Sequence, residues 1–238
     1  MRQARLLLLA MLVAAFAGEI TQAQTGRREA QESIRRGNEK YARAEYEPAI
    51  EEYRRVGPGD DYAQSLYNIG VCYYELWRTE DAIAMYRKAV EAKKGIYPKA
   101  SYALGIALKD AGRPREAKEA YREAIAASSG EHAAAHYMLG LLVAGEGDNE
   151  QAAALFREAI ARSGDGFPAS RNNLGVTLAR MGRLSEAERE FAQALRQSDG
   201  VFDDAARNLK LCRSLLSTHA NGQLSSLKMV ETAKGQNK

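Results

Sequence analysis

The 238-residue sequence predicts an all-α fold, a linear solenoid of stacked helix pairs. The first observation is a set of four glycines at a constant interval of 35 residues: Gly70, Gly105, Gly140 and Gly175. The second is that other residue columns keep the same interval. The third is that apolar residues inside each interval recur at offsets of three and four, as on one face of an amphipathic helix. Repeated helix pairs explain all three.

Five columns match four times each and define the repeat. The residue before each glycine is large and aliphatic, two columns are always alanine, and one is always aromatic. Small residues let helices approach closely, and the aromatic ring fills the space that they leave. The columns are Ile69, Leu104, Leu139 and Leu174; Ala82, Ala117, Ala152 and Ala187; Tyr86, Tyr121, Phe156 and Phe191; and Ala89, Ala124, Ala159 and Ala194. An earlier copy lies 33 residues upstream with Gly37, Ala49, Tyr53 and Val56.

Glycine and proline mark the turns between the helices. Glycine closes a helix because its backbone adopts positive φ without steric cost. Proline is suited to the first turn of a helix, where its missing N–H costs nothing. Gly112, Gly147 and Gly182 mark the turn inside a repeat, Gly95, Gly130 and Gly200 mark the turn between repeats, and Pro98 and Pro168 open first helices.

These columns resemble the tetratricopeptide repeat (TPR) family. The third repeat shows the family pattern as Ser101, Leu104-Gly105, Leu108, Gly112, Ala117, Tyr121 and Ala124. The resemblance covers about residues 31–216 and implies a right-handed superhelical solenoid of about five TPR helix pairs plus a C-terminal capping helix. The period is 35 residues instead of the usual ~34, and the first large position carries no Trp. One extra residue in the turn changes superhelical pitch but not the fold.

The repeat register divides the chain. Leu209 follows Leu174 by 35 residues, but Lys210 replaces the small glycine, so the last helix is expected to cap the stack. The polar end of the chain is expected to be mostly disordered. The expected parts are a signal peptide at 1–23, a linker at 24–30, repeats at about 31–62, 63–97, 98–132, 133–167 and 168–202, a capping helix at 203–216 and a tail at 217–238.

The N-terminal residues predict export. Arg2 and Arg5 precede an apolar run over residues 6–17, and small residues follow, which is the order of a secretory signal peptide. Cleavage fits after Ala17 or after Ala23, and the second site leaves a polar spacer before the cut. The alternative is an uncleaved anchor, but the run is shorter than the roughly 20 residues that span a bilayer. We expect a periplasmic or secreted protein without stable membrane insertion after cleavage.

The composition argues against a nucleic-acid partner and against catalysis. The formal charge is only +3, and no run of Lys and Arg forms a basic patch. The chain has three His and two Cys, and it has no phosphate-binding loop. These residues do not form a recognisable nucleophile, base or cofactor site, so we expect no enzymatic activity and no cofactor. His132 and His136 have the spacing of a metal pair, but His136 occupies the large-residue column of its repeat. We expect packing there and no metal.

The resemblance also implies a binding surface, because first helices line the concave groove of the family. Tyrosine buries a large area at low entropy cost and keeps a hydroxyl for hydrogen bonding. The alternative is that some of these residues only pack between neighbouring first helices. The predicted groove residues are Tyr67, Val71, Tyr74, Tyr102, Ile106, Lys109, Tyr137, Leu141, Asn172 and Val176.

Two narrower sites are also considered. In the carboxylate-clamp subclass, two Lys, two Asn and an Arg hold acidic C-termini; Asn38, Asn68 and Lys99 match these positions. Ile34 and Ala103 replace the remaining Lys and Arg, which disfavours the clamp. Trp77 stands in the column of the turn glycines and is the candidate for an edge contact with a partner.

The sequence therefore predicts a non-enzymatic scaffold or adaptor that binds a peptide or a partner helix of another protein in its groove. The alternatives are a structural subunit of an envelope or secretion assembly and an accessory factor that recruits substrates to an enzyme.

Overall fold

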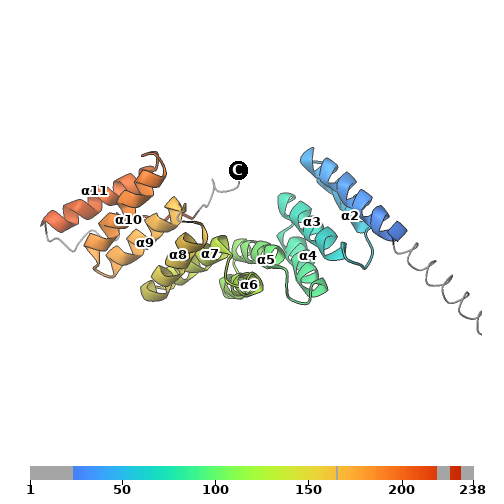
Figure 1. Cartoon of the computed structure of the whole chain (residues 1–238), viewed down its shortest axis with the longest axis horizontal. Helices are drawn as coiled ribbons and strands as arrows, with labels where there is room; N and C mark the ends of the chain where they lie inside the picture. Colours follow the sequence, from blue (N-terminus) through green and yellow to red (C-terminus); the bar gives the residue numbers. More distant parts are fainter. Residues whose placement is uncertain (1–23, 165, 219–225, 232–238) are drawn as a thin grey trace, which may run out of the picture. The chain divides into compact units, whose positions relative to one another are not determined.

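The computed structural model describes residues 24–164, 166–218 and 226–231 (Figure 1). Helices are the only regular secondary structure in these residues, so the all-α prediction is confirmed. The predicted signal segment, residues 1–23, lies outside the described residues. The chain divides into two compact units, unit 1 up to Ala111 and unit 2 from Gly112 onward.

Unit 1 consists of successive helices that pack on one another. Residues 24–42 are helical, so residues 24–30, which the sequence assigns to a linker, continue without a break into the first helix of the repeat. Contacts join α2 to α3, α3 to α4 and α4 to α5. The helices that follow residues 24–42 are α2 (Tyr46–Arg54), α3 (Tyr62–Glu75), α4 (Thr79–Ala92) and α5 (Pro98–Asp110).

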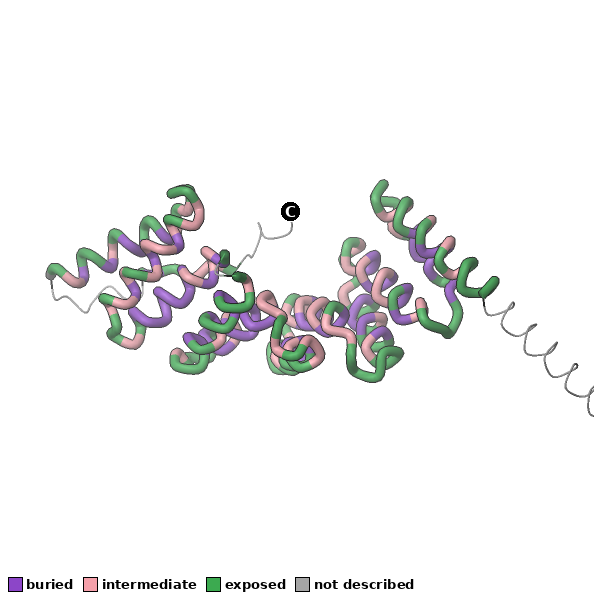
Figure 2. Tube along the Cα trace, viewed as in Figure 1, coloured by how far each residue is buried: buried purple, intermediate pink, exposed green. Residues whose placement is uncertain are grey.

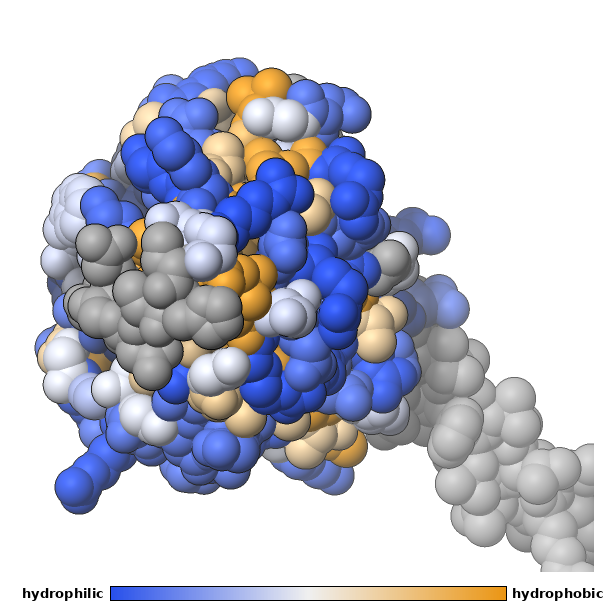
Figure 3. All heavy atoms as spheres, turned by 90° about the vertical axis from the view of Figure 1, so that its left-hand side faces the viewer, coloured by the Kyte–Doolittle hydropathy of each residue, from blue (hydrophilic) through white to orange (hydrophobic). Residues whose placement is uncertain are grey.

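Unit 2 continues the same alternation of first and second helices. Its helices also pack in order along the chain, and α11 contacts both α10 and α9. The predicted capping helix therefore corresponds to α11, and the end of the unit that carries it presents mainly hydrophilic residues (Figure 3). The helices are α6 (Pro114–Ala127), α7 (Ala133–Gly145), α8 (Asn149–Arg162), α9 (Pro168–Arg180), α10 (Leu184–Gln197) and α11 (Asp203–Thr218).

The glycine and aromatic columns meet in four repeats, those with Gly37, Gly70, Gly140 and Gly175. A Cβ atom on any of these glycines would lie closer to the ring than real Cβ contacts allow, so only glycine permits the two helices to touch. The distances from an added Cβ to ring atom Cε1 are 2.4 Å for Gly37 and Tyr53, 2.6 Å for Gly70 and Tyr86, 2.8 Å for Gly140 and Phe156, and 2.7 Å for Gly175 and Phe191. Buried positions follow these facing surfaces (Figure 2).

The turn inside a repeat requires positive φ. Gly112, Gly147 and Gly182 have φ of +72°, +89° and +77°. Trp77 occupies the same column with φ of +59°, although a residue with a Cβ atom meets steric cost in this region.

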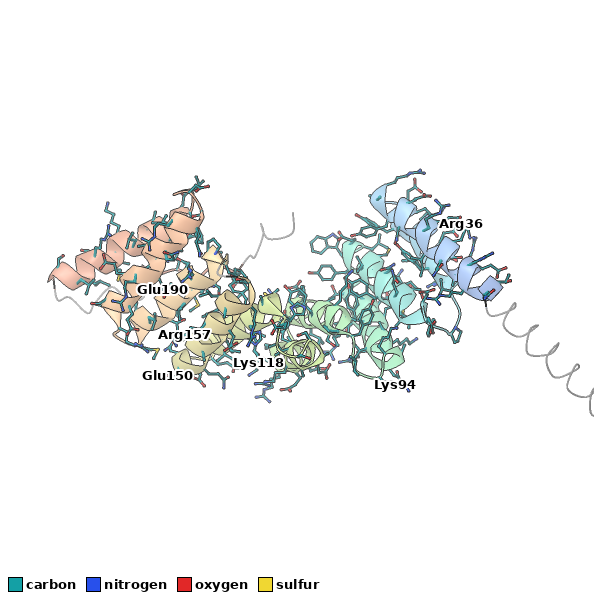
Figure 4. The ribbon with its side chains drawn as sticks, viewed as in Figure 1. Arg36, Lys94, Lys118, Glu150, Arg157 and Glu190 are labelled. Carbon is teal, nitrogen blue, oxygen red and sulfur yellow. The ribbon has the colours of Figure 1, made fainter. Side chains whose placement is uncertain are left out.

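Ion pairs join neighbouring helices of a unit, and Figure 4 labels one residue of each: Arg36, Lys118 and Glu190. Arg36 lies 3.1 Å from the Glu52 carboxylate of α2, and Lys118 of α6 lies 2.6 Å from that of Glu146, just after α7. Arg171 of α9 lies 2.9 Å from Glu190 of α10. These pairs are partly exposed, so they fix the relative placement of helices more than they stabilise the unit.

Candidate peptide-binding face

A short segment from the C-terminal part of the chain lies against the first helices of unit 2. This tail segment, residues 226–231, belongs to the part of the chain that the sequence predicts to be mostly disordered. It contacts four polar residues on α7, α9 and α11, which we call the asparagine face: Tyr137, Asn172, Asn173 and Asn208. These six residues are therefore a part of that stretch whose contacts the structure describes.

Asn208 of α11 holds the backbone of Lys228 at both of its polar groups. The N–H of Lys228 donates to Oδ1 of Asn208 at 3.1 Å, and Nδ2 of Asn208 donates to the carbonyl of Lys228 at 2.9 Å. Nδ2 of Asn172 donates to the same carbonyl at 3.1 Å. The side-chain amide therefore pairs with the peptide as a neighbouring strand would.

Asn173 of α9 repeats this pairing two residues further along the tail. The N–H of Val230 donates to Oδ1 of Asn173 at 2.8 Å, and Nδ2 of Asn173 donates to the carbonyl of Val230 at 2.7 Å. The hydroxyl of Tyr137 on α7 donates to the same carbonyl. Two consecutive first helices thus use one side chain each for the same function.

The alternation of bonded residues defines how the tail segment runs. Lys228 and Val230 turn their backbone polar groups to the same side, as residues i and i+2 of an extended chain do. Two residues of extended chain advance about 6.7 Å, so the Asn208 pair and the Asn173 pair lie about that far apart along the segment. The segment meets α11, then α9, then α7, so it runs against the order of the repeats.

The asparagine face is a connected network. Nδ2 of Asn208 also donates to Oδ1 of Asn172 at 2.9 Å, and Nδ2 of Asn172 donates to Oδ1 of Asn173 at 3.2 Å. Asn172 and Asn173 are 0% exposed and Asn208 is 2% exposed. A buried amide needs partners for two donors and for its oxygen, and the tail backbone supplies them. Removing the segment would expose these groups to water or leave them without bonds.

The side chains of the tail segment divide into buried and exposed positions. Leu227 is 3% exposed, whereas the side chain of the next residue, Lys228, is exposed. Met229 and Val230 are half-buried, so Leu227 is the residue of the segment most fully removed from water.

Unit 1 presents a different first-helix surface, which we call the tyrosine face: Tyr67, Asn68, Val71, Tyr74, Tyr102 and Ile106. All six are half-buried. The ring of Tyr67 lies 5.8 Å from that of Tyr86 and 5.9 Å from that of Tyr97, and the ammonium of Lys99 lies 4.7 Å from its centroid. Burial raises the pKa of Tyr67 to about 12, so its hydroxyl stays protonated at pH values at which an exposed tyrosine ionises.

The predicted groove residues fall into the two units. The predicted groove residues of unit 1 are half-buried. Two of them contact one carboxylate: the hydroxyl of Tyr74 donates to Asp110, and the ammonium of Lys109 lies 3.4 Å from the carboxylate of Asp110. In unit 2, the structure places Tyr137 and Asn172 against the tail segment. Val176 is fully buried, and Leu141 is half-buried. Their role in binding a partner stays a prediction.

Sequence reasoning missed Asn173 and Asn208. Both lie two residues before the repeat glycine position, in the column that continues from Asn68 through Ala103 and Met138. The recurrence of asparagine in this column was the available signal. It could not identify a ligand, because the tail segment has no pattern that predicts docking.

The remaining candidates have structural contacts. The Tyr53 hydroxyl donates to Oδ1 of Asn38 at 2.8 Å, and Nδ2 of Asn68 lies 3.4 Å from the same oxygen, so Asn38 already serves packing inside unit 1. Nδ1 of His132 accepts from the N–H of Ala135 at 3.2 Å and caps α7. The side chain of Trp77 is 92% exposed.

The described residues contain neither a metal cluster nor a membrane span. No group of three or more of their His, Cys, Asp or Glu side chains is arranged to hold a metal ion. None of the described helices combines the length and the apolar character that crossing a bilayer requires.

Comparison with known proteins identifies the repeat. Three sequence profiles of the tetratricopeptide repeat match, over residues 33–95, 102–167 and 143–211. No curated protein matches the chain.

Solved structures agree in fold. A crystal structure of MamA protein is 25% identical with a TM-score of 0.62, and the match covers 72% of this chain and 92% of that one. YrrB, described as a TPR protein with an unusual peptide-binding site, is 22% identical with a TM-score of 0.58, covering 83% and 97%. A thermophilic TPR protein of Thermus thermophilus is 24% identical with a TM-score of 0.52, covering 78% and 100%.

Proposed function

The chain belongs to the tetratricopeptide repeat family, and from this premise we propose that it is a non-enzymatic scaffold that binds an extended segment of a partner protein on the asparagine face. Proteins with these repeats are in general interaction modules without catalytic activity. The peptide-binding description of YrrB belongs to that protein, and at 22% identity the likeness concerns the fold alone. The proposal therefore depends on contacts within this chain.

One observation carries the proposal: the asparagine face already accommodates a peptide backbone. Asn208 and Asn173 each form two hydrogen bonds with one residue of the tail segment. Bonds to main-chain atoms do not depend on the identity of the side chains, so a segment of another protein can make them equally well. A face that binds extended backbone is suited to recognising a partner peptide.

Peptide display tests this proposal even while the partner is unidentified. A random peptide library is selected against the full-length protein, and enriched peptides are titrated against it and against the double variant Asn173→Ala/Asn208→Ala. We expect affinity to fall roughly tenfold or more in the variant, because leaving buried groups without partners costs about 1–3 kcal/mol each.

The matched control is Asn68→Ala, which removes the equivalent side chain from unit 1 and should leave these affinities unchanged. Circular dichroism verifies that each variant keeps its helices. Enriched peptides that bind the double variant as tightly as the parent protein would refute the proposed site.

Export is the second part of the proposal. It is supported by the charged, apolar and small-residue order of residues 1–23. Expression of the full-length chain followed by cell fractionation and N-terminal sequencing tests it. We expect a mature chain that begins directly after Ala17 or directly after Ala23. A cytosolic protein with an intact N-terminus would contradict export.

Trp77 favours a second mode of association, docking of unit 1 by its edge within an assembly. A tryptophan that is 92% exposed at positive φ has no evident packing role, and exposed aromatic residues are frequent hot spots of interfaces. If this mode operates, Trp77→Gly should release the protein from its native complex in size-exclusion chromatography of cell extracts. Asn173→Ala should not. Co-elution of Trp77→Gly with the complex would exclude docking through Trp77.

A further inference from the structure

We propose that the tail segment is the resident ligand of the asparagine face, and that its pattern defines the class of peptide that competes for this face. The class is an extended segment with a large aliphatic side chain at the position of Leu227 and free backbone N–H groups at the positions of Lys228 and Val230. This inference rests on the proposed function and deepens it, because it names the ligand chemistry and a competitor within the chain.

The side-chain requirement follows from burial. Leu227 is 3% exposed, so its position removes an aliphatic side chain from water, which a polar residue could not tolerate without a partner. Lys228 is exposed and contributes only its main chain. The face should therefore select peptides with a large aliphatic residue at the position of Leu227. At the position of Lys228 it should accept any residue except proline.

The backbone requirement follows from the asparagine pairs. Each pair uses one N–H and one C=O of the same residue, at Lys228 with Asn208 and at Val230 with Asn173. Proline lacks the N–H, so it is excluded at both positions. The backbone of Met229 makes none of these bonds, which provides an internal comparison.

Covalent attachment makes the tail segment an effective competitor. Only residues 219–225 separate it from the end of α11 at Thr218. A ligand attached through a short connection has an effective concentration on the order of millimolar. A tail that occupies the face about nine-tenths of the time weakens the apparent affinity of a free peptide about tenfold.

Fluorescence anisotropy with a labelled peptide of residues 224–232 tests the competition in the full-length protein. The variant Leu227→Asp should bind this peptide about tenfold more tightly than the parent protein, because its own tail no longer occupies the face. The matched control Lys228→Asp places the same charge on an exposed side chain and should bind like the parent protein. Equal affinities of the parent protein and Leu227→Asp would overturn the inference.

Peptide variants test the pattern, with the Leu227→Asp protein as receptor. Replacing the leucine of the peptide by aspartate, or N-methylating the amide at the position of Lys228 or Val230, should weaken binding at least about tenfold. N-methylation at the position of Met229 should have a smaller effect. A loss at the Met229 position as large as at its neighbours would overturn the backbone assignment, as would failure of the unmodified peptide to bind.

Hydrogen exchange separates this inference from the proposed function. In the full-length protein, the amides of Lys228 and Val230 should exchange slowly, and Leu227→Asp should increase both rates. Fast exchange in the parent protein refutes the resident ligand, while loss of displayed-peptide binding in Asn173→Ala/Asn208→Ala would still support the proposed function. Slow exchange of these amides, together with displayed peptides whose affinity is the same for the double variant and the parent protein, would refute the proposed function instead.

Discussion

Unit 1 and unit 2 are built from one repeat but present different surfaces on their first helices. Three residues before the repeat glycine, unit 1 has Tyr67 and Tyr102, whereas unit 2 has Tyr137 and then Asn172. The tyrosine face is half-buried, and the asparagine face is buried under the tail segment. The comparison shows that packing columns fix the helix pairs, while the columns beside them vary and determine what each unit contacts.

The largest expected effect concerns the glycine–aromatic packing that the two units share. Gly140→Ala in unit 2 should lower the free energy of unfolding by about 1–3 kcal/mol, because its Cβ would meet Phe156 at 2.8 Å. Gly70→Ala in unit 1 should behave alike, with Tyr86 at 2.6 Å. Urea denaturation followed by circular dichroism measures both. The control is Gly145→Ala, on the same helix as Gly140 but in open space, which should be neutral or stabilising.

The next effect tests the difference between the two faces. Asn173→Ala should cost about 1–3 kcal/mol, because Val230, Tyr137 and Asn172 all lose a bonding partner. Asn68→Ala in unit 1 should stay within about 0.5 kcal/mol, since Asn68 is half-buried and its bond to Asn38 is 3.4 Å long. Urea denaturation of both variants decides this. Equal losses would mean that the tail segment contributes nothing to the stability of unit 2.

The turn column gives a third test. Trp77→Gly should stabilise unit 1 by up to about 1 kcal/mol, because glycine adopts its φ of +59° without strain. The reverse change in unit 2, Gly147→Trp, should destabilise by a similar amount at its φ of +89°. Thermal unfolding of the two variants provides the comparison. A Trp77→Gly protein that is less stable than its parent would indicate that the indole packs on the unit after all.

The smallest effect concerns alkaline pH. Burial raises the pKa of Tyr67, Tyr41 and Cys72 to about 12 in unit 1 and that of Cys212 to about 11 in unit 2. A group whose pKa is raised by folding contributes stability below its unfolded pKa and loses that contribution as pH rises toward the folded value. We therefore expect stability to fall between about pH 9 and 12, with unit 1 affected first.

Methyl NMR spectra of the isoleucines in each unit can measure this difference. Ile83 is buried in unit 1, and Ile160 is buried in unit 2. The native signal of Ile83 should be lost at a lower pH than that of Ile160. Simultaneous loss would mean that the raised pKa values of Tyr41, Tyr67 and Cys72 do not distinguish unit 1 from unit 2.

The sequence predicted the helix pairs because their causes are local and repeated. A glycine that faces an aromatic ring, an alanine at each close contact and a glycine in each turn recur at 35-residue intervals, so neighbouring columns support the same register. The same reasoning placed Tyr137 and Asn172 on first helices. It assigned residues 24–30, where no repeat column extends, to a linker, and in the structure they are helical.

Only the tertiary structure decided what the asparagine face binds. Residues 226–231 lie in a polar stretch that contains few apolar side chains, so composition predicts disorder for them. Their order depends on bonds to Asn173 and Tyr137, which lie 57 and 93 residues away along the chain. Backbone groups form these bonds, and every residue except proline carries both of them. A contact made through atoms common to all residues leaves no pattern in the sequence, so it becomes visible only when the folded helices bring the amides together.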